Sequence, residues 1–279
     1  MKIDFPAAAP DSSALILLVA DGTALTPAAA AAESRTGGQL GRAMKAAGFS
    51  GRKASTLELL APAGMAAERL LLLGLGDPAG ADALLFEELG GKAAELLLTR
   101  AESAALDLSG LSGLAIPPAQ AAAHFALGCE LRAWHQHGYR TTLKDHEKPK
   151  LARLSVAGAA GAAEAHAPLA AVAAGVALTR TLVTEPANIL YPESFVARVE
   201  AAVAPHGVAV TVLDEGEMKA LGFGALLGVA QGSVRPPRLL VMEWNGSGKA
   251  DAPATLFVGK GVTFDTGASA SSPPPAWRT

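Results

Sequence analysis

The sequence predicts an α/β protein of two domains. Short runs of apolar residues, the pattern of buried strands, alternate along the chain with segments that carry apolar side chains at helical spacing. The length of 279 residues suits two domains of roughly 150 residues each. Half of the residues are hydrophobic but only 5% are aromatic, so Leu, Val and Ala must fill the core.

The first half of the chain contains most of the predicted strands. We expect helices at residues 38–47 and 81–98, and a third helix that starts at Pro117 and Pro118 and runs towards Trp134. Proline suits the first turn of a helix because it has no N–H to leave unpaired and its φ angle is already helical. The predicted strands of this half are residues 15–19, 56–60, 70–75, 104–108 and 151–156.

A long alanine-rich helix at residues 163–183 leads into the second half, and Glu185-Pro186 ends it. We place the domain boundary within this helix, which divides the chain into residues 1–165, residues 166–267 and a tail of residues 268–279. The second domain repeats the α/β pattern. Its predicted helices are residues 192–204 and 215–221, and its predicted strands are residues 208–213, 238–244 and 255–258.

Composition excludes several classes of function. The formal net charge is -3 and no stretch is strongly basic, which argues against a nucleic-acid partner. The single cysteine, Cys129, cannot form an intramolecular disulfide, so a reducing compartment is expected. The apolar run near the N-terminus is too short for a signal peptide, and no continuous apolar stretch is long enough to span a membrane. We therefore expect a cytoplasmic protein with no membrane partner.

Three features suggest a site but are better explained as structure. Gly74 and Gly76, with Gly80 further on, resemble a dinucleotide-binding loop, but the spacing is one residue too long and Pro78 interrupts it, which favours a strand-to-helix turn. His135, His137 and His146 would suit a metal site, but their segment is polar and highly charged, so we interpret it as solvated. Cys129 is interpreted as a small buried side chain.

The most informative stretch is residues 256–267, where an apolar strand is followed by a lysine and then an aspartate. Lys260 follows Gly259 directly, and Asp265 comes five residues later. Active sites of open α/β sheets lie at the carboxyl ends of strands, and glycines on both sides of Lys260 allow a tight turn there. Beside a cation the lysine would become a neutral amine and could act as a ligand. By spacing alone, a surface Lys–Asp pair is equally consistent.

Three ordered segments resemble the leucyl aminopeptidase (cytosol aminopeptidase) family. Residues 258–267, VGKGVTFDTG, match the family's metal-binding motif almost letter for letter. Residues 180–188, RTLVTEPAN, are similar to the segment that opens its catalytic domain, although the family more often has Asp and Asn at the positions of Thr181 and Thr184. Residues 221–233, LGFGALLGVAQGS, followed by PPR at 236–238, are similarly close. The resemblance is strong over residues 180–267 and weak before them.

The resemblance implies a macro-like α/β domain at the N-terminus and an α/β/α catalytic domain that is incomplete here. Family members release N-terminal amino acids from peptides with two divalent ions, Mn or Zn, and form homo-hexamers. Lys260 and Asp265 match two of the metal ligands. The other ligands, a further pair of Asp and a Glu, and the catalytic arginine come later in family sequences. We therefore expect a chain that is truncated within the catalytic domain, binds metal weakly or not at all, and does not cut peptides.

The tail suggests why the motif is not continued. The family continues with Gly-Ile-Ser-Ile-Lys-Pro-Ala-Ala-Gly-Met-Glu-Asp-Met. One choice of codons for that segment, read one base out of frame, encodes residues 268–279 and then a stop codon. We hypothesise a frameshift near codon 268, in the gene or in its sequencing. Ser272 then stands at the family's catalytic lysine, and its hydroxyl cannot supply that positive charge. The alternative is a natural disordered tail, since Ser- and Pro-rich runs are often disordered.

Two other functions stay open on the residues alone. The first is a non-catalytic module, in which the N-terminal domain binds a small ligand or joins oligomers of intact subunits. The second is an unrelated nucleotide-binding α/β protein, which would rest on the segment from Gly74 to Gly80.

Overall fold

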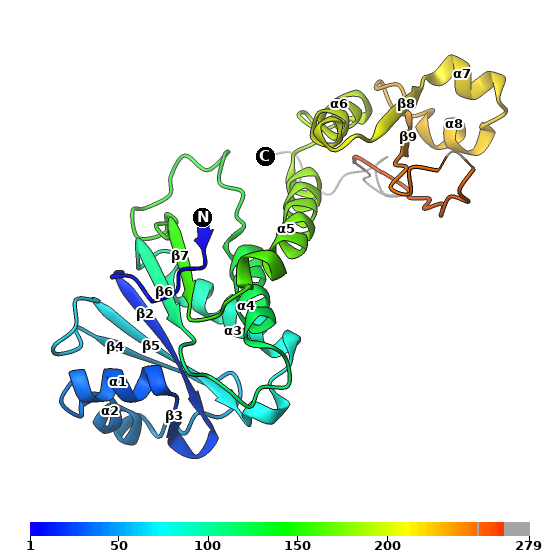
Figure 1. Ribbon diagram of the computed structural model, residues 1–279. Coiled ribbons are helices and arrows are strands. Elements are labelled where there is room, and N and C mark those ends of the chain that lie inside the picture. Colours follow the sequence, from blue (N-terminus) through cyan, green and yellow to red (C-terminus); the bar gives the residue numbers. More distant parts are fainter. Residues whose placement is uncertain (250, 265–279) are drawn as a thin grey trace. The chain divides into compact units, whose positions relative to one another are not determined.

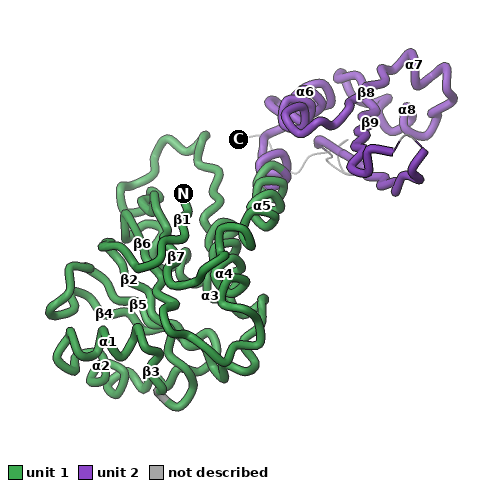
Figure 2. The backbone as a smooth tube through the Cα atoms, viewed as in Figure 1, with its two compact units in different colours: residues 1–178 green, residues 179–279 purple. Residues whose placement is uncertain are grey.

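The computed structural model describes residues 1–249 and 251–264, apart from the side chain of Thr23. The chain divides into two compact units, Met1–Leu178 and Thr179–Thr279 (Figure 2). The division falls in helix α5 (Ala162–Thr184), the same helix in which the sequence places the domain boundary. The predicted tail, residues 268–279, lies outside the described residues.

Unit 1 is built, within the described residues, on a seven-stranded sheet with the order β1-β7-β6-β2-β5-β4, to which β3 is added beside β2. The strands β1, β7, β6, β2 and β5 run parallel to their neighbours, while β4 and β3 are antiparallel to β5 and β2. The strands are β1 (Lys2–Asp4), β2 (Ala14–Ala20), β3 (Ala24–Leu25), β4 (Thr56–Leu60), β5 (Arg69–Gly76), β6 (Ser103–Asp107) and β7 (Arg153–Ala157).

Helices cover both faces of this sheet (Figure 1). They are α1 (Pro27–Arg35), α2 (Gln39–Ala47), α3 (Ala83–Leu97) and α4 (Pro118–Ala133), and short 3₁₀ turns occur at Asp21–Thr23 and Pro78–Gly80. Alternate residues of β2 enter two separate cores. Ile16 and Leu18 pack with α3 and α4, whereas Leu17 and Val19 pack with α1 and α2. Because both faces are covered, β2 is a continuous apolar run, as its sequence predicts.

The α3–α4 contact depends on two glycines. A methyl group at Gly90 would overlap the carbonyl oxygen of Phe125, and one at Gly128 would overlap the carbonyl oxygen of Glu87. The two helix backbones therefore approach more closely than any other residue type would permit. This contact brings Phe86 and Phe125, both fully buried, into the same core.

Cys129 lies in this helical layer, where its Sγ donates a hydrogen bond to the Gly90 carbonyl oxygen at 3.1 Å. Burial, with a smaller contribution from the neighbouring Glu130 carboxylate, raises the pKa of the thiol far above its ordinary value. The prediction that Cys129 is a small buried side chain is confirmed.

We expect Cys129 in the folded protein to resist Ellman's reagent, because the thiolate is the reactive form and its formation is suppressed. One thiol per chain should react once the protein is unfolded in guanidinium. The raised pKa also predicts that the free energy of unfolding falls as the pH rises above 9.0, since the unfolded chain then loses the proton first. This part of the fall should be absent from Cys129→Ala, and rapid labelling of the native thiol would contradict the assignment.

Unit 2, taken by itself, contains α6 (Pro192–Val203), a 3₁₀ turn at Ala204–His206, β8 (Ala209–Leu213), α7 (Glu215–Ala220), α8 (Gly224–Ala230) and β9 (Leu239–Glu243). The two strands form an antiparallel pair. A capping box starts α7, in which the Asp214 carboxylate accepts from the Glu217 N–H at 2.9 Å and the Glu217 carboxylate accepts from the Asp214 N–H at 2.8 Å. Both hydrophobic core clusters of the described residues lie in unit 1, between Ala14 and Ala162.

The expected strand at residues 255–258 is wrong: the structure has no strand there. Leu256, Phe257 and Val258 are 83%, 90% and 88% exposed. A strand needs a neighbour to accept its backbone hydrogen bonds, and within the described residues β9 pairs only with β8. The apolar sequence is suited to a strand, but no strand of the described residues lies beside it.

One helix in residues 1–249 and 251–264, α5, is long and apolar enough to cross a membrane by length and composition. In the most apolar 18-residue stretch of this helix, 11% is buried. The core helices of soluble proteins also pass this test, so a single such helix is weak grounds for a membrane span. The helix includes Pro168 and the charged residues Glu164 and Arg180.

Candidate metal site

Lys260 lies in an irregular, exposed segment of unit 2 that follows β9. Its predicted partner Asp265 lies outside the described residues, and so does Ser272. The structure therefore places one of the two predicted metal ligands and shows nothing of its distance from the other. The exposed side chain of Lys260 carries an amine that could approach a cation from solvent.

A polar turn separates β9 from this segment. The Asn245 side-chain amide donates to the Lys249 carbonyl oxygen at 3.0 Å, and the Ser247 hydroxyl donates to the Asn245 side-chain oxygen at 2.8 Å. These bonds close residues 245–249 locally. The chain from Asp251 to Phe264 is then irregular wherever it is described.

The residues before β9 are held to the start of α6 by charged side chains. The Arg235 guanidinium lies 3.9 Å from the centre of the Tyr191 ring, a cation–π contact. Arg238 Nη2 lies 3.9 Å from Glu193 Oε1, and the Oε2 of Glu193 is buried without a hydrogen-bond partner in the described part of the chain. These contacts fix the entry to β9 and hence the strand that precedes the Lys260 segment.

A second ion pair holds the entry to α6. Arg198 Nη1 and Glu185 Oε1 are 2.9 Å apart, and the Glu185 side chain is only 6% exposed. The glutamate of the EPAN segment, 185–188, is therefore a buried structural anion in this unit. Removing Arg198 would take an ion-pair partner away from a buried carboxylate, which is destabilising.

No group of three or more His, Cys, Asp or Glu side chains is placed to hold a metal anywhere in residues 1–249 and 251–264. The His135 and His137 rings lie 4.8 Å apart, but His146 is exposed. A hydrogen bond from Lys148 Nζ to Asp145 Oδ1, at 2.8 Å, lowers the pKa of that exposed carboxyl. Most of residues 138–150 are exposed, whereas His137 is half-buried.

The glycines at residues 74–76 have a structural role. Gly74 hydrogen-bonds residues 54 and 55 through its backbone, and a side chain at this position would overlap the Arg52 carbonyl oxygen. Gly76 ends β5 with φ at +70°, a conformation that other residues rarely adopt. The strand-to-helix turn is confirmed, and a dinucleotide site is not needed to explain these glycines.

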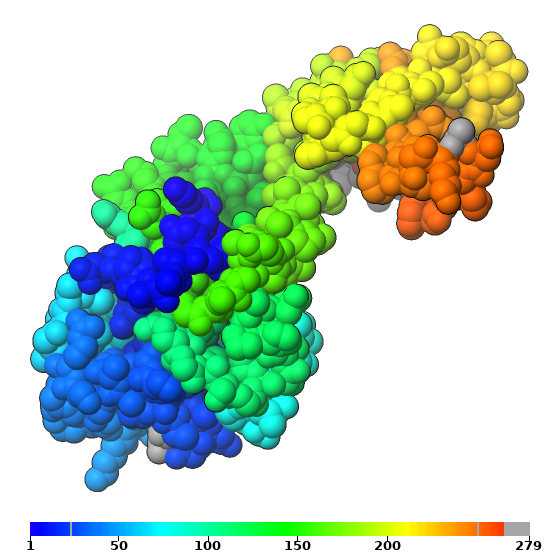
Figure 3. Space-filling model, in the orientation of Figure 1, coloured from blue at the N-terminus to red at the C-terminus, as the bar shows by residue number. Residues whose placement is uncertain are grey.

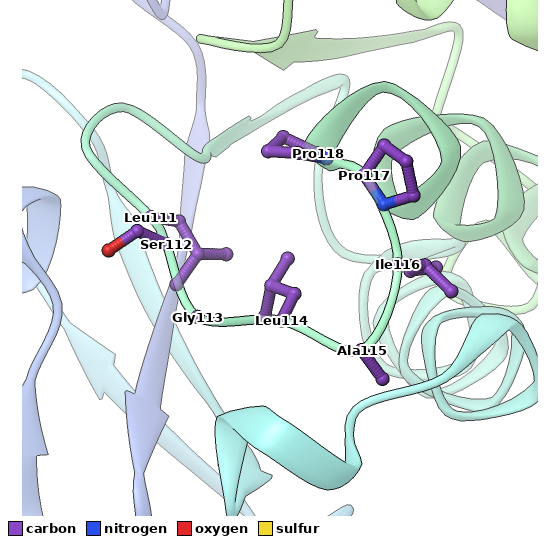
Figure 4. A pocket seen from close by; sticks show the side chains of 8 residues that line it. All are labelled: Leu111, Ser112, Gly113, Leu114, Ala115, Ile116, Pro117 and Pro118. Carbon is purple, nitrogen blue, oxygen red and sulfur yellow. The ribbon is translucent and has the colours of Figure 1, made fainter.

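A pocket of about 460 Å³ lies in unit 1 at the loop that joins β6 to α4 (Figure 4). It is lined by residues 111–118, mainly the apolar side chains of Leu111, Leu114, Ile116 and Pro117. None of its lining residues is titratable, so it offers no acid, base or metal ligand. A second pocket of similar volume lies beside α2, between Leu25 and Phe49.

Sequence inspection missed two pairs of histidine and glutamate between helices. His124 Nδ1 and Glu87 Oε1 are 2.8 Å apart and connect α4 to α3. His166 Nε2 and Glu130 Oε2 are 3.1 Å apart and connect α5 to α4, with the Phe5 ring 5.2 Å from the His166 ring. The partners are 37 and 36 residues apart, so no local pattern could have indicated them.

Models of one protein family match two parts of the chain. The N-terminal domain of the cytosol aminopeptidase family matches residues 16–143, and the catalytic domain of the same family matches residues 177–273. The second match includes both Lys260 and Asp265.

Curated relatives extend this similarity over nearly the whole chain. A probable cytosol aminopeptidase of Caulobacter vibrioides is 41% identical over 267 residues, which are 94% of this chain and 52% of that protein. A probable cytosol aminopeptidase of Rhizobium etli is 44% identical over 278 residues, 98% of this chain and 54% of that protein. The chain therefore spans about half the length of the curated relatives it matches.

Solved structures share the fold. A mutant of tomato leucine aminopeptidase superposes with a TM-score of 0.72 at 25% identity and covers 86% of this chain and 50% of that one. The bottromycin maturation enzyme BotP in complex with Mn gives a TM-score of 0.67 at 24% identity, with 84% of this chain and 45% of that one covered, a likeness of fold alone.

Proposed function

Because the chain belongs to the cytosol aminopeptidase family, we propose that it is the first part of a two-metal hydrolase that releases N-terminal amino acids from peptides. The observation that carries the proposal is the motif of residues 258–267, which lies within the match to the catalytic domain. Peptides are the proposed substrates, the proposed location is the cytoplasm, and the proposed assembly of intact members is a homo-hexamer. No membrane or nucleic-acid partner is proposed.

Lys260 and Asp265 are the proposed metal ligands of this chain. A neutral amine and a carboxylate suit divalent ions such as Mn or Zn, and the exposure of Lys260 leaves its amine accessible. When bound, such ions polarise the scissile carbonyl and activate a water molecule. Two donors do not make a cage for two like-charged ions, and the described residues add no further cluster of ligands.

A polypeptide of these 279 residues is therefore proposed to bind metal weakly and to be inactive. Lys260 and Asp265 would supply one side of a dinuclear site whose other ligands occur later in family sequences. Ser272, at the family's catalytic lysine, could orient a substrate oxygen but could not stabilise a developing negative charge as an ammonium does.

The proposal predicts that this polypeptide releases no leucine from leucine amide, with or without Mn²⁺ or Zn²⁺. A protein made from the gene with the reading frame restored after codon 267 should release leucine and lose this activity on chelation. In that longer protein, Asp265→Asn should reduce turnover more than about 100-fold, since even a residue that only orients a metal ligand is worth 10- to 100-fold.

Asp251→Asn is the matched control, because Asp251 is an exposed acid of the same segment and is not part of the motif. It should leave activity in the longer protein unchanged. Chelator-sensitive release of leucine by the 279-residue polypeptide itself would refute the proposed inactivity. An Asp265→Asn variant as active as the parent would refute the ligand assignment.

A non-catalytic binding or oligomerisation module is the second candidate, favoured by the location of both core clusters in unit 1. It predicts that residues 1–178, expressed alone, unfold in one cooperative transition with urea. A gradual, non-cooperative loss of far-UV circular dichroism would exclude an autonomous module.

A further inference from the structure

Two histidines lie together at the start of the long loop that joins α4 to β7. The loop, residues 134–152, is an irregular segment on the surface of unit 1 (Figure 1 and Figure 3). A connection of this length without helix or strand is uncommon in a compact domain and is often functional. The ring centres of His135 and His137 are 4.8 Å apart, with 34° between the ring planes. The two imidazoles therefore lie on the same side of the chain.

The hydrogen bond that His135 makes leaves one of its nitrogens available to a ligand. Its Nδ1 lies 2.8 Å from the Ala133 carbonyl oxygen, and because that oxygen can only accept, Nδ1 carries the hydrogen. In the neutral ring the lone pair is then on Nε2. A backbone carbonyl that holds one ring N–H is the usual support of a metal-binding histidine, since it fixes both the tautomer and the direction of the ring. The side chain is exposed, so an ion can reach it from solvent.

The ring of His137 has a nitrogen that lacks a partner. Its Nδ1 is buried and has no hydrogen-bond partner in the described part of the chain, although the residue as a whole is only half-buried. A buried polar atom without a partner is unusual and points to a group that would satisfy it. A half-turn of the ring, which needs no change in the backbone, exchanges the positions of its nitrogens and carbons. The Arg140 N–H donates to the His137 carbonyl oxygen at 2.9 Å, which holds the backbone here in a turn.

We propose that His135 and His137 form a two-imidazole site for a divalent transition-metal ion of the Cu²⁺ or Ni²⁺ type, with water molecules completing the coordination. The inference is independent of the proposed function, because it uses neither Lys260 nor Asp265. It departs from the interpretation of the whole segment as solvated chain only at these two rings. His146, the third histidine of the segment, is not part of the proposed site.

The donor set selects this class of ion. The acids of the loop are already engaged, since Asp145 Oδ1 accepts from Lys148 Nζ at 2.8 Å and Glu147 Oε2 accepts from the Lys144 N–H at 2.9 Å. A site that offers only imidazole nitrogens does not suit Mg²⁺ or Ca²⁺, which take oxygen ligands. Structural zinc sites normally use four protein ligands. Cu²⁺ and Ni²⁺ accept tetragonal coordination by nitrogen and water, and Cu²⁺ binds a given nitrogen site most tightly of the divalent series.

Trp134, next to His135, provides a local signal for the experiment. The chain has three tryptophans, so the 279-residue protein with Trp244→Phe and Trp277→Phe reports on Trp134 alone. We expect Cu²⁺ to quench its fluorescence saturably at one ion per chain, and EDTA to restore it, whereas Mg²⁺ leaves it unchanged. His135→Ala and His137→Ala should each raise the Kd for Cu²⁺ at least about tenfold, since even a residue that only orients a ligand is worth that much.

His146→Ala is the matched control, because His146 is an exposed histidine of the same loop. It should leave the Kd unchanged. Protection of Cys129 from Ellman's reagent checks that unit 1 of each variant is folded. Quenching that does not saturate, a Kd unaffected by His135→Ala and His137→Ala, or an equal loss of affinity in His146→Ala would each overturn the inference.

Discussion

Replacing Phe125 by Ala is expected to lower the free energy of unfolding of unit 1 by about 3–5 kcal/mol. Phe125 is fully buried in α4 and belongs to the core between the sheet and the α3–α4 layer. The cost combines the lost burial of the ring with the cavity that it leaves, and the close approach of α3 to α4 limits how far the site can collapse.

Cys129 provides the measurement, since it lies one helical turn further along α4 and is shielded in the folded protein. If Cys129 reacts only in molecules whose unit 1 is unfolded, the labelling rate is proportional to the unfolded fraction. Ellman's reagent should then react with the Phe125→Ala variant roughly a hundredfold to a few thousandfold faster than with the parent.

Leu84→Ala is the control for the Phe125 experiment. Leu84 is in α3 but is 71% exposed, so its truncation should change the free energy of unfolding by no more than about 0.5 kcal/mol. Equal labelling rates for Phe125→Ala and Leu84→Ala would mean that the α3–α4 layer is not packed as described.

Replacing Gly90 or Gly128 by Ala should destabilise unit 1 by about 1–3 kcal/mol each, although both lie inside helices, where the same change is ordinarily favourable. The added methyl group would meet a backbone carbonyl oxygen of the facing helix, Phe125 for Gly90 and Glu87 for Gly128. A backbone atom cannot move aside like the end of a side chain, so the two helices must separate. Urea unfolding followed by circular dichroism measures the effect.

Gly91 gives an internal comparison one residue away in the same helix. A methyl group there would approach its nearest neighbour, the Gly128 carbonyl oxygen, only to an ordinary contact distance of 3.9 Å. Gly91→Ala should therefore stabilise the protein by about 0.5–1 kcal/mol, the usual gain for Gly→Ala in a helix. If Gly90→Ala and Gly91→Ala shift the urea midpoint in the same direction, the close helix contact is wrong.

The main strands and long helices of unit 1 could be predicted from their apolar residues. A strand that is buried on both faces is a continuous apolar run, and a helix that packs on the sheet has apolar residues at helical spacing. The apolar runs at 15–19 and 70–75 are β2 and β5, the central strands, and the predicted helix at 81–98 is α3. The elements that escaped prediction lack such a signature: β1 and β3 are very short, and α1 is mostly alanine, which carries little amphipathic pattern.

The candidate site was found from the sequence motif and not from geometry. Recognition of residues 258–267 depends on the order of residue types, which persists whether or not the site is assembled. The strand expected at 255–258 did not follow, because strand formation needs a neighbour that apolar sequence alone does not supply. The interhelical pairs His124–Glu87 and His166–Glu130 could not be predicted either. The two residues of each pair are distant in sequence and become neighbours only through tertiary packing.

The first strand of the chain sits at the far edge of the unit 1 sheet and pairs in parallel with β7, Lys2 opposite Arg153. During synthesis the N-terminal residues therefore stay unpaired until residues 153–155 of β7 have left the ribosome. Contacts between such distant residues form slowly because a large loop must close first. The pairing of β1 with β7 therefore completes the sheet of unit 1 late, although β1 is made first. A bulky fusion at Met1 should slow this pairing more than any other step in the folding of unit 1.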